Sequence, residues 1–193
     1  MRYLNKNEDS AIIKGGWQYS KTGQRGKIRE TLLNEQKLGD VAGSFCAYSE
    51  AFMRPIDSAN IEHFDDRKKG KSDDDYWNWY AVLGFMNFRK PRIEKYLPVL
   101  CPYDESLRDR NQYHAGEFSA ADPEDAEATN LIELLGWNDP TLADYRRKHI
   151  SRMKDDRKAL FDNDEDFVHH MHNHPENLSF ITALEAELCI TLT

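Results

Sequence analysis

The spacing of apolar residues changes near Pro98, and this change limits the possible folds more than any other feature of the 193-residue chain. Before it, the segment from Ile56 to Phe64 alternates apolar and polar residues, as a strand or hairpin does. The segment from Lys27 to Lys37 places its apolar residues at helical spacing, which predicts an amphipathic helix. Residues 76–90 are apolar and rich in aromatic side chains, and most of their latter part predicts a second helix that Pro91 closes.

After Pro98 the pattern predicts helices alone. Asp122-Pro123 and Asp139-Pro140 are both typical helix starts, and the second leads into a long helix that ends near Phe161. Two shorter helices are expected at 164–172 and 179–188. We therefore expect an α+β protein in two parts, with a strand-containing module and its N-terminal helix over 1–100. An acidic, all-helical lobe over 101–193 would pack on or beside that module.

The charge is divided unevenly along the chain. The net charge is -8, yet residues 1–100 carry 17 Lys and Arg against 14 Asp and Glu, whereas residues 101–193 carry 9 against 20. Two basic clusters, at 67–71 and 89–95, flank the segment with the most reactive side chains. Such clusters contact phosphates in proteins that bind nucleic acids, although a solvated charged surface is the alternative interpretation.

Composition argues against several classes of protein. The longest apolar runs are far shorter than the ~20 residues of a membrane-spanning helix, and the first ten residues lack the apolar stretch of a signal peptide. A cytoplasmic protein is therefore expected. The three cysteines, Cys46, Cys101 and Cys189, are too scattered for a disulfide framework and form no CxxC pair, so reduced thiols are predicted.

One ordered set of residues suggests chemistry: Glu62-His63, then Asn78, then Asn87 with Lys90 three residues later. Neighbouring side chains of a strand point to opposite faces. One of the pair could therefore turn toward a metal and the other toward a water molecule, if the strand bends there. An amide such as Asn87, presented from a following helix, is a suitable oxygen ligand for Mg²⁺. On these residues alone, a structural histidine in an aromatic setting is the commoner outcome.

The order and setting of these residues resemble the HNH endonuclease family, whose core is a ββα-metal motif. In that family an Asp/Glu-His strand is followed by a loop, a central Asn, and a helix with His or Asn and then Lys. The resemblance covers residues 27–90 and rests on Arg29, Leu33 and Gln36, Cys46-Ala47-Tyr48, Ile61-Glu62-His63-Phe64, Trp77-Asn78-Trp79 and Met86-Asn87-Phe88-Arg89-Lys90. Within the family it resembles the PtuB-like nuclease subunit of Septu-type anti-phage systems, which has an ATPase partner.

The resemblance implies a role for each matching residue. His63 would be the general base, and Asn78 would brace the loop and orient His63. Glu62 and Asn87 would hold one Mg²⁺ or Mn²⁺ ion. Arg89 and Lys90 would contact phosphate, and the basic cluster at 67–71 adds Lys68 and Lys69 as expected contacts with nucleic acid. The implied protein is a metal-dependent endonuclease that cleaves nucleic acid, with DNA favoured over RNA, as the effector of a bacterial defence complex with an ATPase partner.

Two departures from the family pattern change what is expected. The usual zinc-binding CxxC pairs are absent, because Ser49 stands three residues after Cys46 and the second pair is missing. We therefore expect no structural zinc, which needs about four ligands. Aromatic packing would hold the hairpin around Cys46 instead, through Phe45, Tyr48, Phe52, Trp77, Trp79 and Phe85. The second departure is Asn87, where many members have His, which favours Mg²⁺ or Mn²⁺ over softer metals.

Other interpretations remain open on the sequence. The chain could be a catalytically inactive HNH-like module that binds nucleic acid or a partner protein. Its acidic lobe could dock a basic partner surface. The histidines from His169 to His174 could bind a metal, although a surface helix end is the simpler interpretation. The run Asp73-Asp74-Asp75 is expected to be a solvated loop.

Overall fold

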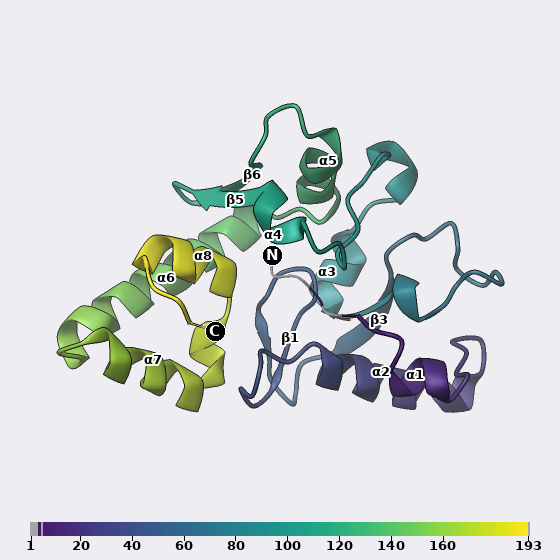
Figure 1. Ribbon diagram of the computed structural model, residues 1–193, viewed down its shortest axis with the longest axis horizontal. Helices are drawn as coiled ribbons and strands as arrows, with labels where there is room; N and C mark the ends of the chain where they lie inside the picture. Colours follow the sequence, from purple (N-terminus) through teal and green to yellow (C-terminus); the bar gives the residue numbers. More distant parts are fainter. Residues whose placement is uncertain (1–3, 5, 193) are drawn as a thin grey trace.

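The computed structural model describes residue 4 and residues 6–192. Within that part the chain has an α+β fold of helices and two-stranded antiparallel sheets (Figure 1). The first half contains α1 (Ala11–Lys14), α2 (Thr22–Glu35), β1 (Ser44–Phe45), β2 (Phe52–Met53), β3 (Ala59–His63), η1 (Tyr76–Asn78), β4 (Trp79–Leu83), α3 (Gly84–Arg89) and η2 (Ile93–Tyr96). The second half contains α4 (Leu107–Arg110), β5 (Asn111–His114), β6 (Glu117–Ala120), α5 (Ala126–Leu134), α6 (Pro140–Leu160), α7 (Asp164–Asn173), η3 (Pro175–Leu178) and α8 (Ile181–Leu188).

The strands β3 and β4 form an antiparallel hairpin, and α3 follows β4 directly and packs against both strands. In this hairpin His63 lies opposite Trp79, at the end where β3 stops. The backbone N–H of Gly84 donates to the Ser58 carbonyl at 3.1 Å, which ties the start of α3 to the start of β3. The predicted strand at 56–64 and the predicted helix late in 76–90 are therefore confirmed as parts of one β-β-α unit.

The two faces of this hairpin pack against different parts of the protein. Trp79 and Ala81 belong to a small cluster with the buried residues of α1 and α2. Tyr80 and Val82 belong to a large cluster that extends into the second half of the chain. Because side chains alternate along a strand, the neighbours Glu62 and His63 point to opposite faces, as the sequence predicts.

Helix α2 confirms the helix predicted at 27–37, but it begins five residues earlier, at Thr22. The residue after it, Gln36, is buried and pairs with the backbone of β4. Its Nε2 donates to the Ala81 carbonyl at 2.7 Å, and its Oε1 accepts from the Ala81 N–H at 2.8 Å. The side chain thereby satisfies backbone groups at the edge of the hairpin.

Aromatic packing holds part of the hairpin formed by β1 and β2, as predicted. The rings of Phe45 and Phe52 meet edge to face with centroids 5.6 Å apart, and Tyr48 lies 5.7 Å from Tyr80. Phe85 takes no such part, because 45% of its surface is exposed. The remaining two predicted residues lie elsewhere, with Trp77 against Tyr103 and Trp79 in the small cluster.

The second half confirms the predicted helices but is not all-helical. Strands β5 and β6 form a hairpin whose residues alternate between buried and exposed, with Tyr113 and Phe118 facing inward. Ala115 and Gly116 form the turn with positive φ angles of 50° and 91°. The prediction of helices alone was wrong here because the two strands are only four residues long, so their alternation is brief.

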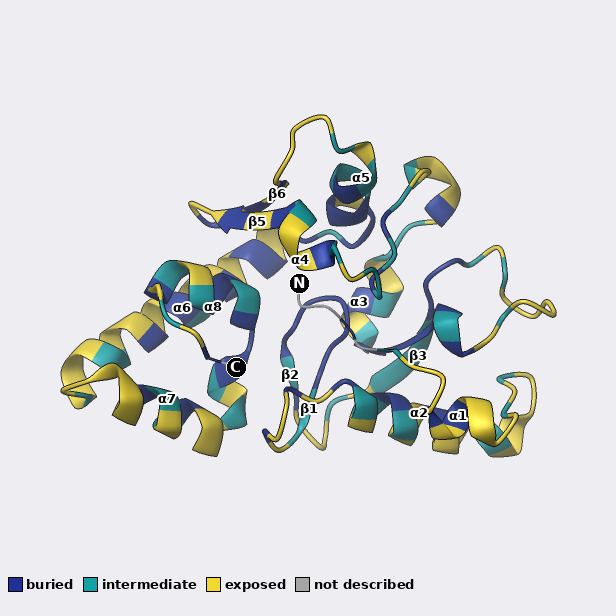
Figure 2. Cartoon of the chain, in the orientation of Figure 1, coloured by how far each residue is buried: buried dark blue, intermediate teal, exposed yellow. Residues whose placement is uncertain are grey.

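The large hydrophobic cluster continues across the predicted boundary at residue 100. The Trp137 indole N–H donates to the Tyr48 carbonyl at 2.9 Å in the buried interior. Glu50, which has a φ of 60°, accepts hydrogen bonds from the N–H and hydroxyl of Thr182 at 3.0 and 2.6 Å. The buried sides of α5 and α8 line this cluster, while much of α6 and α7 faces solvent (Figure 2).

Within the described residues, none of the helices combines the length and apolar character that a membrane crossing requires.

Candidate active site

His63 occupies the last position of β3 and is 2% exposed. Its Nδ1 lies 2.8 Å from Oδ1 of Asp74. Its Nε2 is buried and has no hydrogen-bond partner among the described residues. The rings of Tyr19 and His63 meet edge to face, with centroids 4.5 Å apart and planes at 87°. An unpaired, buried ring nitrogen is rare and calls for a functional or structural explanation.

Asp74 joins His63 to the loop that precedes β4. Its side chain is 3% exposed. It accepts hydrogen bonds from the Gly70 N–H at 2.9 Å, from Asn78 Nδ2 at 3.1 Å and from the Trp79 indole at 2.8 Å. The prediction that this acidic run is a solvated loop is therefore wrong for Asp74. No periodic signal marks its burial in the sequence, because the loop around it is charged.

The hydrogen bonds on Asp74 decide its protonation. Burial by itself raises the pKa of this carboxyl, but the donors of Gly70, Asn78, His63 and Trp79 outweigh burial and lower the pKa below its usual range. The carboxylate is therefore ionised near neutral pH and can only accept hydrogen bonds. It follows that Nδ1 of His63 carries the proton and that Nε2 keeps a free lone pair.

Asn78 fixes the backbone just beyond β3. Its Oδ1 accepts from the Asp65 N–H at 2.7 Å, and its Nδ2 donates to the Asp65 carbonyl at 3.1 Å. Its own carbonyl accepts from the Phe64 N–H at 2.8 Å. Asn78 thus braces the loop directly, and it reaches His63 only through their shared partner Asp74.

On the opposite face of β3, Glu62 forms an ion pair with Lys90, with 3.1 Å between Oε1 and Nζ. Both side chains are largely buried, at 13% and 3% exposure. Lys90 Nζ also lies 3.4 Å from the His63 carbonyl. Asn87 is half-buried on α3, one helical turn before Lys90.

The oxygens of Glu62 and Asn87 are of the kind that Mg²⁺ prefers, since this ion is usually held by one or two carboxylates and several waters. Such an ion would have to share Glu62 with Lys90. Within the described part of the chain, no group of three or more His, Cys, Asp or Glu side chains is arranged to hold a metal. At the end of α7, His172 Nε2 lies 2.6 Å from the Leu192 carbonyl, and the rings of His170 and His174 are tilted with centroids 4.4 Å apart.

The four predicted phosphate contacts lie in different settings. Lys90 is buried against Glu62, and Arg89 forms an ion pair with Asp139. Lys68 is half-buried, and Lys69 is exposed. Of these four side chains, only Lys69 therefore has a free, accessible charge on the face that carries His63.

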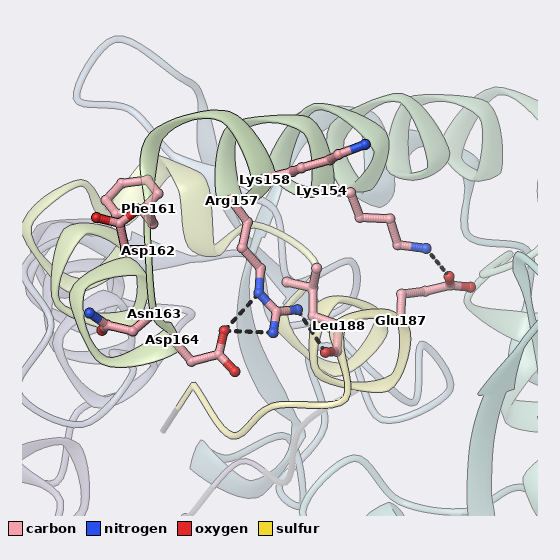
Figure 3. Close-up of a pocket in the computed structure, with 9 residues that line it drawn as sticks. All are labelled: Lys154, Arg157, Lys158, Phe161, Asp162, Asn163, Asp164, Glu187 and Leu188. Carbon is pink, nitrogen blue, oxygen red and sulfur yellow. Dashed lines mark hydrogen bonds and ion pairs between the residues drawn. The ribbon is translucent and has the colours of Figure 1, made fainter.

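A cavity of about 480 Å³ lies between the end of α6, the start of α7 and the end of α8 (Figure 3). Two of its basic side chains pair with carboxylates. Arg157 pairs with Asp164 at 2.6 Å and Lys154 pairs with Glu187 at 2.6 Å. This cavity holds no reactive group comparable with His63.

The buried histidine predicts a pH dependence of stability. Burial lowers the pKa of His63 and outweighs the opposing effect of Asp74, which raises it. The folded state therefore binds this proton less readily than the unfolded state, where the pKa is about 6.5. The contribution of His63 to stability is complete above about pH 6.5 and is lost as the pH falls. Urea unfolding should show a lower free energy of unfolding at pH 5.5 than at pH 7.5.

The His63→Asn variant is the control for this effect. Its amide can still donate to Asp74, but it does not titrate. The drop in stability between pH 7.5 and 5.5 should be smaller in this variant than in the wild type. His149, whose pKa is also lowered by burial, adds a background that both proteins share. An equal drop in both would contradict the assignment to His63.

Comparison with known proteins gives no relative for this chain: no protein family, curated protein or solved structure matches it.

Proposed function

We propose that this protein is a metal-dependent endonuclease of the HNH type that hydrolyses phosphodiester bonds in nucleic acid. The observation that carries the proposal is His63 itself, with its Nδ1 on a buried carboxylate and its Nε2 unpaired at the end of a strand. The β-β-α order of β3, β4 and α3 supports it, because the family resemblance implies the same order. DNA is the preferred substrate in this proposal. The role of effector in a bacterial defence complex with an ATPase partner rests on that resemblance.

In this proposal His63 acts as a general base. Nε2 takes a proton from a water molecule as its oxygen attacks the phosphorus, and Asp74 stabilises the resulting imidazolium. One P–O ester bond then breaks, and the leaving oxygen takes a proton from solvent. A divalent cation held by Glu62 and Asn87 would neutralise charge on the phosphate and the leaving group. Nε2 is buried, so the side chains around the imidazole, which include Tyr19, have to move before water can reach it.

Incubation with supercoiled plasmid in Mg²⁺ or Mn²⁺ tests the proposal. The wild type should nick or linearise the plasmid, and EDTA should stop it. His63→Ala should reduce the rate by about 10²–10⁴-fold, because the general base is removed. His63→Asn is the matched control, since it can keep the bond to Asp74 but offers no base. Cleavage at the wild-type rate by both folded variants would refute the assignment.

The second candidate function is a binding module without catalysis. The observation that favours it is the burial of His63, 2% exposed beneath Tyr19, which also suits a structural histidine. This alternative predicts binding of nucleic acid or a partner protein with no cleavage that depends on His63. The plasmid assay therefore separates the two candidates.

A further inference from the structure

A cavity of about 610 Å³ lies between residues 18–20, Arg25 and the loop 69–74, and two of its lining residues, Tyr19 and Asp74, contact His63. Its cationic side chains are Arg25, Lys69 and Lys71, which are all exposed. Among the ion pairs between described residues, none involves these three. Asp74 also lines the cavity, but its oxygens already accept hydrogen bonds from His63 and its neighbours.

The three cations outnumber Asp74, the carboxylate that lines the same cavity, so the lining carries a net positive charge. The cavity of Figure 3 differs, because two of its basic side chains are paired with carboxylates across it. Unpaired Lys and Arg side chains around a concave site are the arrangement that attracts phosphate groups. The overall charge of the chain is negative, so this concentration is not a consequence of composition.

Tyr19 links the cavity to the buried histidine. Its ring covers His63 and also lines the cavity. Arg25 holds this residue in place: its Nε donates to the Tyr19 carbonyl at 2.8 Å, and its guanidinium lies 4.5 Å from the ring centroid. A ligand that draws Arg25 toward itself would weaken both interactions. A ligand that shifted Tyr19 in this way would also change the packing around the His63 imidazole.

We propose that this cavity binds the phosphodiester backbone of a DNA strand, with Arg25, Lys69 and Lys71 contacting its phosphates and Tyr19 moving aside as the strand enters. The inference rests on the proposed function and deepens it, because it names the surface that presents the strand to His63. In this inference Arg25, Lys69 and Lys71 contact the phosphates in place of Arg89 and Lys90, which form ion pairs with carboxylates.

Binding of a fluorescent DNA duplex, measured by anisotropy in EDTA so that no strand is cut, tests this inference. Lys69→Ala/Lys71→Ala should weaken binding strongly, by roughly tenfold for each of the two lysines at about 0.1 M salt. The slope of log K against log salt should become shallower by about 2. Both residues are exposed in a loop, so the variant should fold normally.

Lys148→Ala/Lys158→Ala is the matched control, since it removes the same charge from exposed positions on α6. It should keep the wild-type affinity and salt slope. Equally weakened binding in both double variants, or unchanged binding in the cavity variant, would overturn the inference. Plasmid cleavage by the wild type together with unchanged affinity in the cavity variant would overturn this inference alone. Cavity-dependent binding without cleavage would instead overturn the proposed function.

Discussion

The Asp74→Ala variant is expected to lose about 3–5 kcal/mol of its free energy of unfolding. Asp74 is the common acceptor for donors from Gly70, Asn78, Trp79 and His63. Its removal takes the partner from the donors of His63 and Trp79 in a region where its own side chain is 3% exposed, and an unmade buried hydrogen bond is costly. Urea unfolding at pH 7.5 measures the difference.

Asp73→Ala is the control for this prediction, because Asp73 is exposed and lies in the same loop. Its free energy of unfolding should stay within about 0.5 kcal/mol of the wild type. A decrease below about 1 kcal/mol for Asp74→Ala, comparable with an ordinary exposed hydrogen bond, would show that the carboxylate does not hold the loop.

The Asp74→Asn variant removes the negative charge of this side chain but keeps its shape. The amide keeps the volume of the side chain, but it can turn its NH₂ group toward His63 and so favour the tautomer in which Nδ1 lacks the proton. Nε2 would then carry that proton and could not act as a base. In the proposed mechanism, plasmid cleavage should fall by about 10²–10⁴-fold in a protein that still folds.

The second large effect is expected from removing residues 124–193, which should leave the first half unfolded. The two halves share one large hydrophobic cluster, and the deletion removes its buried residues Leu131, Leu134, Trp137, Phe180, Leu184 and others. Tyr48 would also lose the indole of Trp137, and Glu50 would lose Thr182. Circular dichroism and amide proton dispersion in NMR spectra would show the absence of folded structure.

Single substitutions calibrate this prediction. Trp137→Ala should cost about 3–5 kcal/mol, as expected for a large aromatic residue removed from a core. Leu160→Ala should cost little, because Leu160 is 68% exposed at the end of α6. A folded, monomeric fragment of residues 1–123 would show instead that the first half is an independent domain.

The sequence predicts those helices and strands whose residue pattern extends over many consecutive positions. The helix from Asp139 to Phe161 is found almost to the residue, as α6, because a side-chain cap and an N-terminal proline mark its start. The strand at Ile56 to Phe64 is found because its alternation lasts several residues. The hairpin of β5 and β6 is missed because each of its strands is only four residues long.

The candidate site is predictable only in part, for a similar reason. Family resemblance selects Glu62, His63 and Asn78, but it gives no reason to single out Asp74, which lies in a charged loop. The burial of Asp74 depends on Trp79 and Gly70 folding around it, which is a tertiary effect. The ion pair between Lys90 and Glu62 is also a tertiary effect, because it forms only where α3 packs against β3.

Because side chains alternate along β3, Glu62 and His63 lie next to different parts of the protein. His63 contacts the segment between α1 and α2 and the loop before β4. Glu62 instead forms an ion pair with Lys90, the residue that follows α3, on the side of the large core. A mutation or partner that shifts residues 18–25 would therefore act directly on the surroundings of the imidazole. It would reach the carboxylate side through β3 and through Lys90, whose Nζ lies near both Glu62 and the His63 carbonyl.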